Sequence, residues 1–306
     1  MLEVNRILFP TDFSSCADAA FNEAIRFARI FDAEIIIFHS CILPRTDQLN
    51  IGYYLKDIEK EKKLLSDHVN EQLLKCVDQA KTEHIKISHH QENAVDAAES
   101  IVNYAKEVSA DLIVMGTHGR HGFSRAFMGS VAEKVVRLSD CPVCTIKHKK
   151  QKTAIGRIVV PIDFSPSSRH ALLVSKYLAE LLDEKLILLN IISYSSETTL
   201  QQDVLVQSAN RIPEIIDKRN VELKAMFMNC SGPNVEFECN TKVGAAYEIT
   251  KFAKKANAHL VIISSHGNHE EKDILIGSTS EKVIRNSDCP VLTLKTFGKQ
   301  LTSKRK

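Results

Sequence analysis

The chain contains one long segment twice, and this repeat restricts the fold more than any other feature of the sequence. Asn5-Arg-Ile-Leu-Phe-Pro-Thr-Asp-Phe-Ser14 returns as Gly156-Arg-Ile-Val-Val-Pro-Ile-Asp-Phe-Ser165, which places Asp12 and Asp163 151 residues apart. Each half also closes on a matched block, Ser139-Asp-Cys-Pro-Val143 and Ser287-Asp-Cys-Pro-Val291. Solenoid repeats have periods of roughly 20 to 50 residues. A repeat as long as this one therefore predicts a whole domain present in two copies.

The domain boundaries are predicted from composition. We place the first domain at residues 1–148, a linker at 149–156, the second domain at 157–297 and a basic tail at 298–306. The linker position rests on the polar, basic run from Lys147 to Thr153, because such composition is typical of segments between domains.

Composition and charge exclude several classes of protein. A hydrophobic content of 44% and a charged content of 25% are typical of a globular protein. The net charge is only +2 and tryptophan is absent, which argues against nucleic-acid binding. No apolar stretch reaches the ~18 residues of a membrane span, and the N-terminus lacks the apolar region of a signal peptide. We expect a cytoplasmic protein without membrane contact.

The cysteines and histidines show no reliable metal pattern. Cys141-Pro-Val-Cys144 has redox or metal spacing, but the second copy reads Cys289-Pro-Val-Leu292. Leucine in the place of Cys144 favours a buried core strand. The twelve histidines have no HExxH or paired spacing, so we expect no metal held by the protein alone.

Hydrophobic periodicity predicts the fold class. Short apolar runs at residues 7–9, 34–38, 85–87, 111–115 and 143–146 alternate with segments of helical period, and the second half repeats the order. Continuous apolar strands separated by helices indicate a parallel sheet covered on both faces. We expect two tandem doubly wound α/β domains, each with five parallel strands. Pro213 is expected to break or start a helix.

Two segments in each copy have the character of a ligand site. In doubly wound sheets, ligands bind at the carboxyl ends of strands where the winding reverses. Pro10-Thr-Asp12 and Pro161-Ile-Asp163 end the first strands, and Gly129-Ser130 opens a helix. Free N–H groups at a helix start bind anions, and a carboxylate at a strand end accepts hydrogen bonds from ribose hydroxyls. These features favour a nucleotide pocket.

Structural roles also account for these residues. Asp12 suits a turn because aspartate bonds its own backbone. Gly129-Ser130 is also expected where a helix is simply capped, and His118 and His266 are also consistent with packing at corners. The chain has neither a GxxxxGK[ST] loop nor a GxGxxG fingerprint.

Taken together, the motifs resemble the universal stress protein family. The resemblance rests on the spacing Gly116-x2-Gly119-x9-Gly129-Ser130, the segment Pro10-Thr-Asp12-Phe-Ser14 and the closing Asp140-Cys-Pro-Val143. The resemblance covers nearly the whole chain as two tandem domains and implies a stress-response regulatory protein of the nucleotide-binding branch. The implied cofactor is ATP, with or without Mg²⁺. The implied contacts in the first copy are Pro10, Thr11, Asp12, Ser40, Met115, Gly116, His118, Gly119, Arg120, Gly129, Ser130 and Val131.

The resemblance also suggests a role for each group of contacts. We assign Asp12 to ribose, Ser40 and Met115 to the adenine side, and Gly119, Gly129 and Ser130 to phosphates. The second copy departs from the pattern, because Ser264 replaces the first glycine and Ile191 stands on the adenine side. Its weaker candidates are Pro161, Ile162, Asp163, Ile191, Ile263, Ser264, His266, Gly267, Gly277, Ser278 and Thr279.

Charge between the glycines separates the two copies further. Residues 120–128 carry two arginines and no acid, whereas residues 268–276 carry three acids and one lysine. A full charge at 4 Å in water is worth about 1 kcal/mol, less when screened by salt. The first copy is therefore expected to bind the polyphosphate more tightly.

The functional alternatives are a nucleotide-independent scaffold or interaction protein and a slow ATPase. No acidic pair and no lysine accompany the loop, and phosphoryl transfer needs metal ligands and charge stabilisation, so an efficient enzyme is not expected. The expected partners are the nucleotide and an unidentified regulatory protein. Family dimers join through the last strand, so residues 143–146 and 291–294 are expected to pair as an internal pseudo-dimer. Further homodimerisation stays open.

Overall fold

The first domain is a parallel α/β unit. The computed structural model describes residues 3–42, 67, 69–79, 83–118, 128–147, 156–192, 202–228, 235–241, 244–265, 276–295 and 301. The first five strands are β1 (Arg6–Pro10), β2 (Glu34–Ile42), β3 (Ile87–Ala94), β4 (Leu112–Gly116) and β5 (Val143–Ile146). Their helices are α1 (Ser15–Phe31), α3 (Ala97–Glu107) and α4 (Ser130–Leu138), with helical residues also at 69–79.

The second domain repeats this order. Its strands are β6 (Arg157–Pro161), β7 (Lys185–Ile192), β8 (Val235–Thr241), β9 (Leu260–Ser264) and β10 (Val291–Leu294). Its helices are α5 (Pro166–Leu182), α6 (Gln202–Met228), α7 (Ala245–Lys255) and α8 (Ser278–Asn286). The prediction of two tandem doubly wound domains is confirmed.

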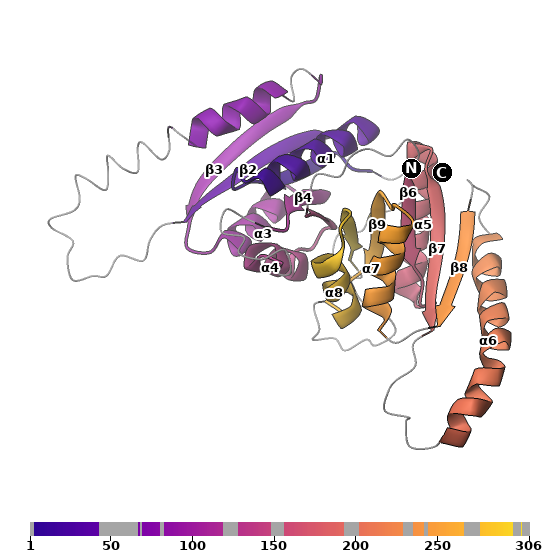
Figure 1. The fold of residues 1–306 in the computed structure, drawn as a ribbon. Helices are drawn as coiled ribbons and strands as arrows, with labels where there is room; N and C mark the ends of the chain where they lie inside the picture. Colours follow the sequence, from indigo (N-terminus) through magenta and orange to yellow (C-terminus); the bar gives the residue numbers. More distant parts are fainter. Residues whose placement is uncertain are drawn as a thin grey trace, which may run out of the picture.

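The two domains share one continuous sheet. Its strand order is β3-β2-β1-β4-β5-β10-β9-β6-β7-β8, and Figure 1 shows the two halves side by side with helices against the strands. Pairs within each domain are parallel, whereas β5 and β10 pair antiparallel with Leu292 opposite Cys144. The chain is an internal pseudo-dimer, and Cys144 is fully buried in a core strand.

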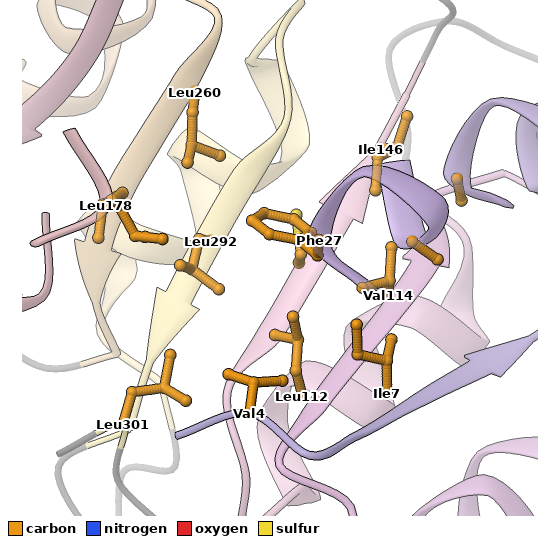
Figure 2. Close-up of a cluster of buried hydrophobic side chains, with 14 of the residues drawn as sticks. Val4, Ile7, Phe27, Leu112, Val114, Ile146, Leu178, Leu260, Leu292 and Leu301 are labelled. Carbon is orange, nitrogen blue, oxygen red and sulfur yellow. The ribbon is translucent and has the colours of Figure 1, made fainter. Parts of the chain in front are cut away.

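Both faces of the sheet are covered by apolar side chains. One hydrophobic cluster lies under α1 and α5 and includes Phe27, Leu178 and Leu292, so it runs without a break from one domain to the other. Figure 2 shows this junction, where Val4 of the first domain lies near Leu301. A second cluster lies under α3, α4, α7 and α8. Burial of both faces explains why the inner strands read as continuous apolar runs.

Two predictions of secondary structure were wrong. The third strand was expected at residues 85–87, but β3 covers Ile87–Ala94. It is an edge strand whose only described neighbour is β2, so it needs no apolar run. Pro213 lies inside α6 instead of ending it. Pro213 is exposed, and the helix accepts the loss of one backbone donor there.

Candidate functional site

The sheet reverses its winding between β1 and β4. From β1 the chain winds outward through β2 to β3, then returns to β4 on the other side of β1. The carboxyl ends of β1 and β4 therefore lie next to each other, and Ser14 Oγ donates to the His118 carbonyl across them at 3.3 Å. The structure thus brings together the two segments that the sequence singled out in the first copy.

The loop after β1 is a tight turn stabilised by its own side chains. Thr11 Oγ1 accepts from the Phe13 N–H at 3.0 Å, and Asp12 Oδ1 accepts from the Ser14 N–H at 3.1 Å. Phe13 has a φ of 60°, and these bonds offset the cost of that left-handed conformation. Asp12 is therefore a turn-forming residue, and its half-buried carboxylate lies at the mouth of the winding reversal.

The second copy builds the same turn. Asp163 Oδ1 accepts from the Ser165 N–H at 3.0 Å and from Ser165 Oγ at 2.5 Å. Asp163 is exposed, whereas Ile162 beside it is 2% exposed. Pro161 ends β6 as Pro10 ends β1.

A polar residue within the second strand of each domain holds this turn, and sequence reasoning missed it. His39 Nδ1 donates to the Thr11 carbonyl at 2.7 Å, and Asn190 Nδ2 donates to the Ile162 carbonyl at 2.7 Å. His39 and Asn190 are 151 residues apart, the same offset as the repeat. Each follows directly after an apolar run, and this position in the sequence could have identified both residues.

The adenine-side candidates differ between the copies. Ser40 Oγ is buried and has no hydrogen-bond partner in the described part of the chain. Its counterpart Ile191 packs against the apolar cluster under α7 and α8. Met115 and Ile263 are each 5% exposed within that same core. An orphaned hydroxyl costs free energy, and a base edge is a partner that would satisfy it.

Two of the motif glycines are explained by packing within the chain. A Cβ on Gly116 would lie 3.1 Å from Cys16 Sγ, and a Cβ on Gly129 would lie 2.9 Å from the Thr117 carbonyl oxygen. The second copy accommodates Ser264 at 8% exposure. The first glycine therefore reflects close packing on α1, so its replacement does not by itself exclude a ligand.

The N-terminus of α4 lacks the side-chain cap that three other helices have. Ser14, Asp96 and Ser165 accept N–H groups at the starts of α1, α3 and α5. The N-cap of α4 is Gly129 and that of α8 is Gly277, without side-chain bonds. The residues that follow, Ser130, Val131, Ser278 and Thr279, lie in the first helical turns.

Backbone bonds position both of these helix starts. The Gly129 N–H donates to the Thr117 carbonyl at 2.7 Å, and the Gly277 N–H donates to the Ser265 carbonyl at 2.7 Å. Ser130 is exposed and does not cap α4. Helix starts without a side-chain cap leave N–H groups for water or an anion.

Four predicted contacts lie outside the described residues: Gly119, Arg120, His266 and Gly267. Within the described ranges, no three histidine, cysteine, aspartate or glutamate side chains gather closely enough to hold a metal ion. The same part of the chain contains no helix of the length and apolarity that a membrane crossing requires.

Comparison with known proteins agrees with this geometry. The model of the universal stress protein family matches residues 3–147 and again residues 154–295. The chain belongs to the universal stress protein family. Universal stress protein MJ0531 of Methanocaldococcus jannaschii is 36% identical over 148 residues, which is 48% of this chain and 84% of that protein. Universal stress protein YxiE of Bacillus subtilis is 28% identical over 47% of this chain and 99% of its own length.

Solved structures show the same tandem fold. A universal stress protein from Archaeoglobus fulgidus superposes with a TM-score of 0.66 at 22% identity, covering 95% of this chain and 98% of its own. A protein from Pseudomonas aeruginosa described as a putative universal stress protein gives 0.61 at 17% identity, covering 95% and 93%. At these identities the likeness concerns the fold, a tandem universal stress protein pseudo-dimer.

Proposed function

We propose that this universal stress protein is a stress-response regulator that binds adenine nucleotide, ATP by the family resemblance, at the winding reversal of its first domain. The supporting observation is that three features suited to a nucleotide lie at the same edge of the sheet. The turn bearing Asp12, the buried hydroxyl of Ser40 and the start of α4 at Gly129 all belong to the carboxyl edge of the first domain. They suit ribose, base and phosphate in that order.

The second domain is proposed to bind the nucleotide more weakly. It has the same turn and the same helix start, but Ile191 offers no hydrogen-bonding group where Ser40 does. The segment 268–276 adds net negative charge where 120–128 is positive. The first difference disfavours the adenine base in the second domain, and the second disfavours the polyphosphate.

The test is isothermal titration calorimetry with ATP, in the presence and absence of Mg²⁺, on matched variants. Gly119→Glu places a carboxylate in the expected phosphate loop of the first domain, and Gly267→Glu does the same in the second. We expect Gly119→Glu to abolish the tighter binding phase and Gly267→Glu to leave it unchanged. Unaltered affinity in Gly119→Glu, with circular dichroism showing a folded protein, would refute the site.

A second function, a nucleotide-independent scaffold, is favoured by one observation. Gly116 and Gly129 pack closely against Cys16 and Thr117, so packing within the chain would also account for the glycine motif. Native mass spectrometry of gently purified protein separates the two functions. One nucleotide per chain supports the regulator with unequal sites, and two would contradict the asymmetry. Failure to take up millimolar ATP with Mg²⁺ would leave the scaffold.

A further inference from the structure

A cluster of charged side chains joins the two domains on one side of the β5–β10 seam. Glu23 and Arg26 come from α1, Glu184 directly precedes β7, and His259 directly precedes β9. Arg26 Nη2 lies 2.6 Å from Glu184 Oε1, and Arg26 Nη1 lies 3.0 Å from Glu23 Oε1. His259 Nδ1 lies 3.1 Å from Glu184 Oε1. We call these four residues the interdomain ion cluster.

The cluster has one buried member, Glu184, and three partly exposed ones. Glu184 has a side-chain exposure of 7%. Burial raises the pKa of Glu184, but hydrogen bonds and charge from His259 and Arg26 outweigh it and hold the pKa below its ordinary value. A Cβ on Gly156 would lie 2.2 Å from Glu184 Cδ, so a glycine is needed there to leave room for the carboxylate.

At the matching place on the other side of the seam, the described residues form no such cluster. The repeat makes Val174 and Tyr177 the counterparts of Glu23 and Arg26, and Ala33 and Asp111 the counterparts of Glu184 and His259. Val174 is 1% exposed and Ala33 is 4% exposed. Asp111 Oδ2 accepts the Asn5 N–H at 2.8 Å and the Arg6 N–H at 2.9 Å, within its own domain.

The lysine and strand contacts at the seam have a counterpart in each domain. Lys147 Nζ donates to the Arg285 carbonyl at the end of α8, and its counterpart Lys295 Nζ donates to the Val136 carbonyl in the last turn of α4. The strand pairing between β5 and β10 is likewise the same in both directions. Two identical domains would be able to make each of these contacts, so the contacts do not select a partner.

We propose that the interdomain ion cluster selects the second domain as the partner of the first and disfavours the pairing of two like domains through this edge. In a pair of second domains, Glu184 and His259 would face Val174 and Tyr177, which leaves a buried carboxylate without Arg26. In a pair of first domains, Ala33 would stand where Glu184 binds Arg26, and Asp111 would take the place of His259 beside Glu23 and Arg26. Each mismatch occurs twice by symmetry, and a buried charge that loses its partner weakens association on the order of 100-fold.

The proposal also restricts how whole chains assemble. When two chains associate through these strands, the first domain of each chain is expected to pair with the second domain of the other. This selection goes beyond the proposed nucleotide function and does not depend on it, because none of the four residues belongs to the nucleotide site.

The test starts from the folded full-length protein with a specific protease site inserted between residues 147 and 154, where the two family matches are separated. After cleavage, the halves are equilibrated in enough urea to exchange, returned to buffer and weighed by native mass spectrometry. We expect first–second pairs, with like pairs at about one in a hundred or fewer. A binomial mixture of the three pairs overturns the proposal.

Matched variants give a second, independent readout. Glu23→Val with Arg26→Tyr gives the first domain the residues of the second, so pairs of first domains should rise at least tenfold. Glu184→Ala with His259→Asp should raise the pairs of second domains in the same way. If one of the two variants fails to fold, the other still tests the proposal. Glu71→Val with Lys75→Tyr, an exposed ion pair at 2.9 Å on one helix, is the control and should change nothing. Like pairs that do not increase in either interface variant would refute the selection.

Discussion

The carboxyl edges of the two domains have the same backbone bonds but different side chains. In both, a glycine N–H at the start of the last helix donates to a carbonyl just after the fourth strand, and a polar side chain within the second strand holds the first turn. The difference lies at Ser40 and Ile191, and in the charges of the glycine segments. Bonds that maintain the loop are thus shared, whereas groups suited to a ligand occur mainly in the first domain. The following predictions test that division.

The largest effect is expected at the seam, from Lys295. Burial lowers the pKa of Lys295 to about 8, although electrostatic interactions with Cys141 and Asp140 partly raise it. The unfolded chain binds this proton up to about pH 10.4, so stability should rise with pH between 8 and 10.4, by roughly 3 kcal/mol. Urea unfolding should lose this slope in Lys295→Met but keep it in Lys147→Met. An unchanged slope in Lys295→Met would contradict the assignment.

Gly129→Ala tests the shared backbone bonds. The added Cβ would lie 2.9 Å from the Thr117 carbonyl oxygen, so we expect a loss of about 1–3 kcal/mol of unfolding free energy. Urea denaturation monitored by circular dichroism measures it. Ser130→Ala is the control, because Ser130 is exposed and caps nothing, and it should stay within about 0.5 kcal/mol. Equal effects of the two would show that the packing at Gly129 is unimportant.

Exchanging the adenine-side residues tests the difference in recognition. Ser40→Ile should weaken ATP binding in the first domain about fivefold, since one hydrogen bond is worth about 1 kcal/mol. Ile191→Ser should strengthen the second site by a smaller factor, because the charges of 268–276 remain. Isothermal titration calorimetry on both variants measures the affinity for ATP. Unchanged affinity for ATP in Ser40→Ile would show that Ser40 does not contact the nucleotide.

The smallest effect is expected from reproducing the second domain's packing in the first. Gly116→Ser should cost about 1 kcal/mol because its Cβ would approach Cys16 Sγ at 3.1 Å. Adding Cys16→Ser recreates the Ser264 and Ser167 pair of the second copy, so part of the loss should return. Thermal melts of the two single variants and the double variant give the coupling, and strict additivity would argue against the contact.

Much of the fold followed from the sequence alone. The matched blocks predicted two domains because each block had a second copy, and the apolar runs predicted the inner strands because both sheet faces are buried. The position of β3 was missed because an edge strand with one described neighbour does not need an apolar run. The helix through Pro213 was missed because local propensity favours a break there, whereas the surrounding helix continued.

The sequence by itself determined the repeat, the class of fold, the pairing of the last strands and the loops that meet at the winding reversal. Only the tertiary structure revealed which contacts account for particular residues in and around those loops. It assigned Gly116 and Gly129 to close contacts with Cys16 and Thr117, and His39 to the carbonyl of Thr11. It also joined Arg26 to Glu184, residues 158 positions apart. Periodicity reports which face a side chain takes, but contacts between distant segments depend on how the layers pack.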